Sequence, residues 1–514
     1  MFSKVLSVTL IGIEAYEVVV ETDIASGLPN FSIVGLPATS IKESRERVRA
    51  ALKNCGFDFP SRRITVNLAP ADLKKDGSTF DIAIATGILI ASGQLPAASV
   101  EKKMLIGELS LDGKIREVPG VMAMVSSIKK AQGSDGIEHF LLPRGNSREA
   151  SLGSNYPVTG VDNLKDLVAL LKGELHIPET NVNLEDYHAN EDMNNEPDFA
   201  EVKGQVLAKR ALEVGAAGGH NVLLTGPPGT GKTMLARRIP SILPDMNLKE
   251  CLDITKIHSV AGLLKEDRPL VIRRPFRSPH HSSTVAGILG GGRIPQAGEV
   301  SLSHLGVLFL DEFPEYSREV LEGLRQPLED REVTITRLET TIRFPARFML
   351  VASRNPCPCG YYQHPYKECR CSELQIRRYR AKSSGPLMDR IDLHVEVPSL
   401  QYKDLEIKEP GESSSNIKKR VEAARNIQRK RFSKIGIDCN AGMSHKHIPK
   451  FCPLSKEARE ILRRAFDALS LSMRAHDRIL KIARTIADLE GEQEMLLLHH
   501  ITEAIQYRSQ DRDY

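Results

Sequence analysis

Short hydrophobic runs of two kinds alternate in the first third of the chain. β-rich runs at residues 18–20 and 63–67 are interleaved with helical runs at residues 41–53 and 82–91. Runs of these lengths and periods are typical of strands and helices that follow one another. The pattern therefore predicts an α/β or α+β domain in this part of the chain.

The middle of the chain carries continuous apolar runs, which are typical of strands buried on both faces. They occupy residues 221–225, 307–310 and 348–352. A helical pattern precedes the first run at residues 204–214, and another follows it at residues 234–238. Buried strands separated by helices predict a parallel sheet.

After Pro398 the sequence changes to helix formers and basic residues. Residues 417–430 and 456–469 are amphipathic, and residues 473–489 form another long helical run. We expect a helical C-terminal domain.

An acidic stretch separates the first region from the second. It contains no Lys or Arg, and Asn and Pro are interspersed, which is typical of a solvated connector. The predicted order is an N-terminal domain at residues 1–172, a linker at 173–201, an α/β domain at 202–398 and a helical domain at 399–514.

The composition of the chain restricts the classes of protein to which it can belong but does not indicate a function. A chain of 514 residues, 41% hydrophobic and 26% charged, is ordinary for a folded protein of about two to four domains. The net charge of +4 is too small to indicate a nucleic-acid partner by itself. No apolar run reaches the roughly 18 residues of a membrane helix, and the apolar residues 5–13 lack a following cleavage site. We expect a cytoplasmic protein that does not span a membrane.

A glycine-rich loop lies between the first apolar run and the next helix. In this pattern glycines let backbone N–H groups point at phosphates, Lys232 offers a charge to the outer phosphates, and Thr233 offers a hydroxyl to Mg²⁺. A strand before the loop and a helix after it are the context that the motif requires. The residues expected to bind ATP are Gly226, Pro227, Pro228, Gly229, Thr230, Gly231, Lys232 and Thr233.

Polar residues follow the second and third apolar runs. Asp311 and Glu312 end the run at 307–310, and Asn355 lies just beyond the run at 348–352. We expect Asp311 to bind the hydrated Mg²⁺ and Glu312 to polarise the attacking water. A short amide on a rigid strand end suits Asn355 to contact the γ-phosphate or that water. Together these residues predict ATP hydrolysis.

A later arginine predicts that the catalytic site is shared between subunits. Arg390 closes the segment 384–390, which presents it after a helical turn. A guanidinium from a neighbouring subunit can stabilise charge on the transferring phosphoryl group. We therefore expect an oligomer.

Four of the eight cysteines form two Cys-x-Cys pairs separated by nine residues. Four soft ligands can close a tetrahedral Zn²⁺ site, and four thiolates make such a site structural because no coordination position stays open. The alternative is that reduced cysteines pack an irregular loop. The predicted zinc ligands are Cys357, Cys359, Cys369 and Cys371.

The order of these motifs resembles that of the AAA+ ATPases. Over residues 200–507 it is similar to the magnesium chelatase motor subunit, and the segments 355–360, 384–390 and 484–489 are similar to the ComM/YifB family of natural transformation factors. This resemblance covers nearly the whole chain. It implies an α/β fold with an AAA+ P-loop ATPase core and an α-helical C-terminal lid.

The resemblance also implies a function and further site residues. A hexameric ring would hydrolyse ATP between subunits and drive branch migration of DNA joints, a helicase activity of homologous recombination and natural transformation. Branched, three-stranded or single-stranded DNA is the implied partner. By position in the family motifs, Arg390 is the finger, Arg474 is a second sensor, and Gln205 lies at the adenine pocket.

Two insertions of the family would face the ring's pore and contact DNA. They match residues 277–292 and 332–344 here, with Arg337 at a hairpin tip. The adjacent histidines 280 and 281 in the first insertion lack further ligands nearby, and we interpret them as a solvated or DNA-facing loop. The basic run at residues 377–382 is a second candidate for phosphate contact.

The N-terminal domain is similar to the proteolytic domain of Lon, notably at residues 74–79 and 106–113. A Ser–Lys protease needs a serine nucleophile and a lysine of lowered pKa. The matching positions hold Thr79 and Met122, so we expect an inactive α+β scaffold. Two alternatives stay open: a chelatase-type motor for metal insertion or protein remodelling, and an ATP-dependent Lon-like protease, which these two residues disfavour.

Overall fold

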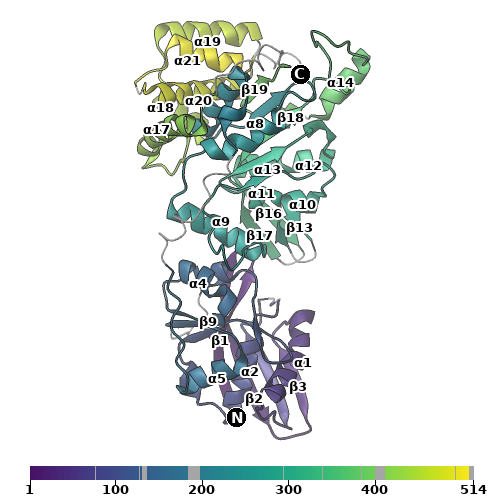
Figure 1. Cartoon of the computed structure of the whole chain (residues 1–514), viewed down its shortest axis with the longest axis vertical. Coiled ribbons are helices and arrows are strands. Elements are labelled where there is room, and N and C mark those ends of the chain that lie inside the picture. Colours follow the sequence, from purple (N-terminus) through teal and green to yellow (C-terminus); the bar gives the residue numbers. More distant parts are fainter. Residues whose placement is uncertain are drawn as a thin grey trace. The chain divides into compact units, whose positions relative to one another are not determined.

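The computed structural model describes the chain except residues 74, 76, 127, 130–135, 183–196, 293–294, 338–339, 384, 400–410, 470, 493 and 509–514. Figure 1 shows the whole chain coloured along the sequence. The chain divides into two compact units. Unit 1 comprises Met1–Glu191 and Leu248–Ile272, and unit 2 comprises Asp192–Asn247 and Arg273–Tyr514.

A mixed sheet forms the centre of unit 1. Its described strands follow the order β10-β9-β5-β1-β2-β4-β3, and β8 pairs with β2. The first two strands form a long antiparallel hairpin, whereas β5, β9 and β10 add to its edge in parallel. The strands are β1 (Phe2–Ile11), β2 (Glu14–Ala25), β3 (Asn30–Val34), β4 (Arg63–Ala69), β5 (Lys103–Leu105), β8 (Ile128–Lys129), β9 (His139–Pro143) and β10 (Val158–Val161).

Helix α2 is the buried centre of this unit. It is apolar all round, every one of its residues is buried, and it packs on β1 and β2. Gly87 permits that approach, since a Cβ there would lie 2.6 Å from the Thr22 hydroxyl. The helices of unit 1 include α1 (Thr39–Asn54), α2 (Asp81–Ala91), α3 (Val121–Ser126), α4 (Ser147–Gly153), α5 (Leu164–Lys172) and α9 (Leu248–Val260), and a small hairpin pairs β6 (Glu108–Leu109) with β7 (Ile115–Arg116).

Helix α9 belongs to unit 1 although it lies in sequence between two parts of unit 2. It packs on α3 and buries Cys251, Ile254 and Ile257. Its Ser259 hydroxyl donates a hydrogen bond of 2.8 Å to Glu149, and burial raises the pKa of that carboxyl. The buried polar contact fixes the position of the helix on its unit.

Unit 2 contains the parallel sheet that the apolar runs predict. Its five strands follow the order β12-β15-β18-β11-β19, and all neighbours are parallel. The carboxyl ends of β11, β15 and β18 therefore meet at one edge. The strands are β11 (Val222–Thr225), β12 (Phe276–Arg277), β15 (Val307–Leu310), β18 (Met349–Arg354) and β19 (Leu393–Glu396).

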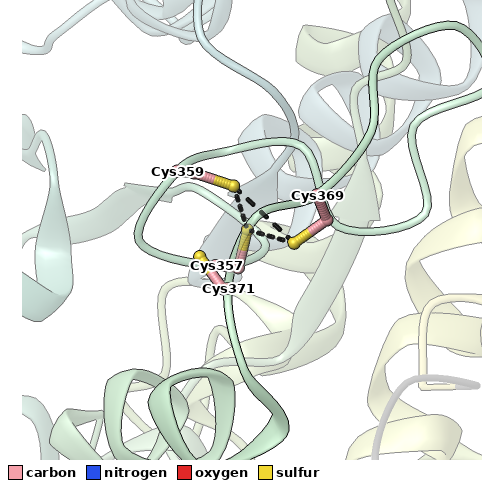
Figure 2. Close-up of side chains that lie close together, drawn as sticks. All are labelled: Cys357, Cys359, Cys369 and Cys371. Atoms are coloured by element: carbon pink, nitrogen blue, oxygen red, sulfur yellow. Dashed lines mark hydrogen bonds between the residues drawn. The ribbon is translucent and has the colours of Figure 1, made fainter.

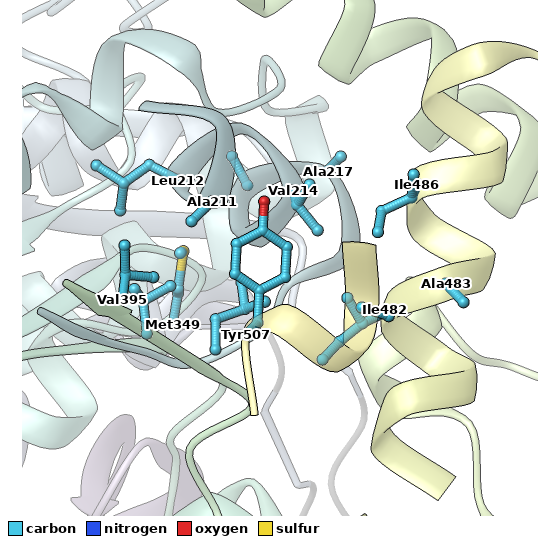
Figure 3. Close-up of a cluster of buried hydrophobic side chains, with 14 of the residues drawn as sticks. Ala211, Leu212, Val214, Ala217, Met349, Val395, Ile482, Ala483, Ile486 and Tyr507 are labelled. Carbon is cyan, nitrogen blue, oxygen red and sulfur yellow. The ribbon is translucent and has the colours of Figure 1, made fainter. Parts of the chain in front are cut away.

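The predicted helices of the C-terminal region are also present, and they share a hydrophobic core with the sheet. Figure 3 shows Ile482, Ala483 and Ile486 near Ala217 and Val214, with Tyr507 and Met349 in the same cluster. The helices are α7 (Val206–Gly218), α8 (Lys232–Arg238), α17 (Ser414–Phe432), α18 (Ile448–Phe451), α19 (Lys456–Leu469), α20 (Met473–Glu490) and α21 (Leu498–Gln506).

A buried charge cluster stabilises this C-terminal packing. The Asp488 carboxylate accepts hydrogen bonds from Arg431 at 2.8 Å, Asn440 at 2.8 Å and Arg484 at 3.1 Å. Both Asp488 and Arg484 are almost fully buried. A buried carboxylate with this many charged and amide partners holds its surrounding helices in one arrangement.

Shorter elements of unit 2 surround the sheet. They include the hairpin β16 (Glu332–Arg337) and β17 (Thr340–Pro345), the pair β13 (Gly290–Gly291) and β14 (Gln296–Ala297), and helices α10 (Val285–Leu289), α11 (Glu299–Leu302), α12 (Arg318–Gly323), α13 (Arg325–Asp330), α14 (Glu373–Lys382) and α15 (Gly385–Met388). Among the described residues, no helix combines the length and the apolar character needed to cross a membrane.

Candidate nucleotide-binding site

The glycine-rich loop connects β11 directly to α8. Gly229 and Gly231 have φ angles of +78° and +87°, a region that side chains rarely adopt, and Gly231 caps α8. Gly226 is needed for space instead, because a Cβ there would lie 2.2 Å from the Val397 carbonyl oxygen. The loop therefore curls tightly and presents the start of α8 to the cavity that it borders.

Lys232 lies within this curl. Its Nζ donates hydrogen bonds to the backbone oxygens of Gly226 at 2.7 Å and Pro227 at 2.8 Å, and to Asn355 Oδ1 at 3.3 Å. Burial lowers the pKa of Lys232 to about 8, although the nearby Asp311 and Glu312 act in the opposite direction. A desolvated ammonium with few counter-charges is a site that favours an added anion.

Asp311 is bound from two sides. The Thr233 hydroxyl donates a 2.8 Å hydrogen bond to one carboxylate oxygen, and the Ser353 hydroxyl donates to the other. Ser353 lies on β18, which pairs with β15 so that Ala352 faces Leu310. The residues after this pair therefore meet, and the strand register accounts for a contact that we did not predict.

Glu312 has an unusual backbone and an unexpected neighbour. Its φ of +52° is rare for a residue with a side chain and is a form of strain that concentrates at functional sites. Its carboxylate lies 3.7 Å from His281 Nδ1. The Tyr316 hydroxyl donates a 2.6 Å hydrogen bond to the Pro279 carbonyl, which holds the histidine loop near this carboxylate. The interpretation of the histidines as a solvated or DNA-facing loop therefore omits the contact of His281 with Glu312.

One cavity of about 420 Å³ collects most of the predicted residues. Its position matches the expectation that the ends of parallel strands surround a ligand. Its lining residues are Pro228, Gly229, Thr230, Gly231, Lys232, Thr233, Met234, Asp311, Glu312, Ser353, Arg354 and Asn355.

Gln205 lies behind the phosphate loop. It caps α7 with a φ of +54°, and its amide donates hydrogen bonds to the Pro398 carbonyl at 2.8 Å and the Thr230 carbonyl at 3.3 Å. The side chain is buried, and its Oε1 has no hydrogen-bond partner among the described residues. A buried, unused acceptor beside the loop is a place for a donor group of a ligand.

Arg390 and Arg474 do not line this cavity. Arg390 pairs with Glu329 of the same chain and donates to the Pro386 carbonyl at 2.5 Å. Arg474 is exposed near the start of α20. Their predicted roles as finger and second sensor stay predictions.

The four clustered cysteines converge (Figure 2). All four sulfur atoms lie within 4.8 Å of one another. The separations are 3.4 Å between Cys357 and Cys359, 3.6 Å between Cys359 and Cys369, and 3.7 Å between Cys357 and Cys369. The loop that connects them begins two residues after Asn355 and ends where α14 begins. The predicted ligand set is thus brought together at the edge of the candidate site.

Of the two predicted DNA-contacting insertions, residues 277–292 are described throughout, and the hairpin is described in part. The hairpin over residues 332–344 is present as β16 and β17, while the side chain of Arg337 and residues 338–339 lie outside the described part of the chain. Of the basic run, Arg377 is exposed on α14 and Arg378 lies beside it, also exposed.

The protease-like positions of unit 1 carry no nucleophile and base of the required kind. Thr79 is buried, and its hydroxyl has no hydrogen-bond partner among the described residues. Met122 is fully buried in α3 and cannot accept a proton. Lys74 and Asp76, which contribute to the resemblance, lie outside the described residues.

A strand, a glycine-rich loop with Lys232 and Thr233, and an acidic strand end in a parallel sheet define a P-loop nucleotide-binding domain. Three family models match the chain. "Magnesium chelatase, subunit ChlI" matches residues 198–405, "Subunit ChlI of Mg-chelatase" matches residues 20–146, and "Magnesium chelatase, subunit ChlI C-terminal" matches residues 411–508.

Relatives that align with nearly the whole chain identify the family within this class of proteins. The competence protein ComM of Haemophilus influenzae is 42% identical over 504 residues, which cover 98% of this chain and 96% of that protein. The uncharacterized protein YifB of Escherichia coli is 41% identical over 510 residues with the same coverage. An uncharacterized Mycobacterium tuberculosis protein is 43% identical over 489 residues, 95% of each chain. The chain therefore belongs to the ComM/YifB family of magnesium chelatase-like ATPases, as predicted.

Proposed function

We propose that the chain is the subunit of an ATP-driven motor that moves branched DNA joints in natural transformation and homologous recombination. The observation that carries the proposal is the convergence of Lys232, Thr233, Asp311, Glu312 and Asn355 on one cavity. A relative that matches 98% of the chain is named for competence. Competence is the uptake of DNA, so that name favours DNA as the substrate.

ATP with Mg²⁺ fits the residues at the cavity. The Thr233 hydroxyl and the Asp311 carboxylate lie 2.8 Å apart, as two oxygens that bind one hard cation and its water must. Bound Mg²⁺ neutralises charge on the β- and γ-phosphates. Gln205 offers its unpartnered Oε1 to the amino group of adenine, whereas guanine presents an oxygen at the corresponding position.

Different residues of the chain then have different roles in ATP hydrolysis. Lys232 binds the phosphates, and Asn355, within 3.3 Å of Lys232 Nζ, orients the attacking water. Glu312 accepts the proton of that water. In this proposal Arg390 acts on the nucleotide of a neighbouring subunit in a homo-hexamer, a role supported by its position outside the cavity lining of its own chain. Arg474 reaches the nucleotide when the C-terminal helices close on it.

Zn²⁺ fits the cysteine cluster. Four thiolates at 2.3 Å from a tetrahedral zinc ion are separated from one another by about 3.8 Å. The separations among the sulfur atoms of Cys357, Cys359 and Cys369 are 3.4–3.7 Å, close to that value without any rearrangement of the loop. We propose a structural zinc ion held by all four cysteines.

Unit 1, with Thr79 and Met122 at the protease-like positions, is a Lon-like scaffold without peptidase activity.

A branch-migration assay tests the motor. Labelled three-stranded and four-stranded joints are incubated with the full chain and Mg-ATP, and strand exchange is followed on gels. The parent should process joints only with ATP, and Lys232→Ala should not process them because it lacks the charge that binds phosphates. Equal processing with and without ATP would exclude a motor. An ATPase rate that is the same with and without each DNA structure would favour a chelatase-type remodelling motor instead.

A further inference from the structure

The cysteine cluster lies against the nucleotide site on two sides. Cys357 is fully buried and follows Asn355 after a single proline. Three residues after Cys357, Gly360 contacts the phosphate loop, because a Cβ at Gly360 would lie 2.5 Å from Cδ of Pro228. The backbone of the cysteine loop therefore touches the phosphate loop directly, and Gly360 has the φ of +84° that this approach requires.

Helix α14 leads from the end of the cysteine loop back to the region of Asn355. It starts immediately after Cys371, where Ser372 and Gln375 form a capping box. Seven residues after Ser372, buried Tyr379 lies close enough to the Asn355 backbone for that backbone N–H to lower the pKa of its hydroxyl, against the larger effect of burial, which raises it. The far end of the helix pairs Lys382 with Glu315 at 3.1 Å, three residues beyond Glu312.

These contacts form a closed path through the cluster. The chain runs from Asn355 to Cys357, crosses the cluster to Cys371, follows α14 and comes back to Asn355 through Tyr379. A metal ion bound by the four sulfur atoms would cross-link the two ends of the loop and restrict its conformations. Without the ion, the segment between residues 357 and 371 relies on few backbone hydrogen bonds, such as Gly360 N–H to the Cys357 carbonyl at 3.0 Å.

We propose that zinc at Cys357, Cys359, Cys369 and Cys371 positions Asn355 and the phosphate loop, so that zinc retention and nucleotide binding stabilise each other. The inference rests on the ATP and zinc sites proposed above. The new element is the coupling between the two sites. If bound zinc favours the loop conformation that binds nucleotide, then bound nucleotide must increase the affinity for zinc by the same factor. The cluster acts through Asn355 and Pro228 and does not contact the reacting atoms.

Zinc release from the intact chain tests the coupling. The full-length protein is challenged with excess 4-(2-pyridylazo)resorcinol, and the coloured zinc complex is followed over time. Saturating Mg²⁺ with a non-hydrolysable ATP analogue should slow release about fivefold, a modest value for coupled sites. Lys232→Ala, which lacks the phosphate-binding charge, should release zinc at one and the same rate with and without the analogue.

A glycine pair supplies the matched variants. Gly360→Ala places a Cβ against Pro228, whereas Gly436→Ala has a similar positive φ of +67° but nothing within 4 Å. Both substitutions carry the same backbone strain, and only the first disturbs the contact. We expect Gly360→Ala to retain zinc at the parent's stoichiometry while its nucleotide affinity falls about tenfold. Gly436→Ala should match the parent in both measurements.

The possible outcomes separate the coupling from the sites on which it rests. Nucleotide that binds to a zinc-containing protein without changing zinc release overturns the inference and leaves both sites standing. Equal nucleotide affinities of Gly360→Ala and Gly436→Ala overturn it as well. Purified protein without zinc overturns the zinc site and the inference, while the ATPase proposal is judged by nucleotide binding in the same samples. If Gly360→Ala does not fold, the release experiment on the parent decides alone.

Discussion

Alkaline pH should weaken nucleotide binding through Lys232. Burial lowers the pKa of this lysine to about 8 in the nucleotide-free chain. Phosphates beside the ammonium raise its pKa in the complex, so binding takes up a proton when the free lysine is neutral. Affinity is therefore almost fully present at pH 7 and is lost as the pH rises through about 8.

The size of the effect follows from the fraction of lysine that is charged. With a pKa of about 8, roughly 90% of Lys232 is protonated at pH 7 and roughly 10% at pH 9. If the neutral lysine contributes no binding, the dissociation constant rises about tenfold over this range, which is ~1.4 kcal/mol. The phosphates do not add to the trend, because they ionise near pH 6.

Fluorescence anisotropy of a labelled, non-hydrolysable ATP analogue with Mg²⁺ measures this dependence at pH 7, 8 and 9. The matched control is Lys232→Arg, whose guanidinium stays charged throughout and should give a flat profile, whatever its absolute affinity. Circular dichroism at each pH verifies that the chain stays folded. A parent dissociation constant that changes less than twofold, or an equal slope in the arginine variant, would refute the reasoning.

Three further predictions concern hydrolysis, subunit sharing and stability. Glu312→Gln should bind nucleotide normally but lose about 10²–10⁴-fold in phosphate release, since the amide cannot accept the proton; full activity would exclude this base. Arg390→Ala should be inactive alone and regain hydrolysis when mixed with Lys232→Ala subunits; mixtures that stay inactive would argue against a shared site. Asp488→Asn should lose about 3–5 kcal/mol of unfolding free energy, because Arg431 and Arg484 lose their buried counter-charge. The exposed Asp467→Asn should change it by less than ~0.5 kcal/mol; equal melting of the two variants would contradict the role of the cluster.

Much of the nucleotide site was predictable because its residues are consecutive or lie at strand ends. The phosphate loop is one uninterrupted segment, and its conformation follows from Gly229 and Gly231. Asp311 and Asn355 end predicted apolar strands, and the parallel pairing of those strands places both at one edge. The type and approximate bounds of the central strands and C-terminal helices follow from the same periodicity.

Contacts that depend on loop geometry were not predictable. His281 reaches Glu312 because the Tyr316 hydroxyl holds Pro279, and no spacing in the sequence encodes that arrangement. The contact of Gly360 with Pro228 joins segments more than a hundred positions apart. The pairing of Arg390 with Glu329 likewise depends on the position of a separate helix.

The placement of α9 was missed for a different reason. Its amphipathic pattern shows that one face is buried but does not identify the surface that covers it. Its position between residues 202 and 398 predicts that the segment belongs to the central domain, whereas it groups with unit 1. The side chains that decide its partner, such as Glu149 and Ser259, are far apart in the chain.

The excursion of the chain into unit 1 at Leu248–Ile272 determines how the protein can be dissected. We therefore expect that cutting the chain at the acidic linker leaves an ATPase fragment that is not self-contained. A fragment that starts at Pro197 keeps α9 but loses the helix α3 on which it packs, so Ile254 and Ile257 become exposed. Such a fragment is expected to aggregate. A soluble fragment is expected only when Leu248–Ile272 is replaced by a short flexible linker, because unit 1 is built from two separate segments of the chain.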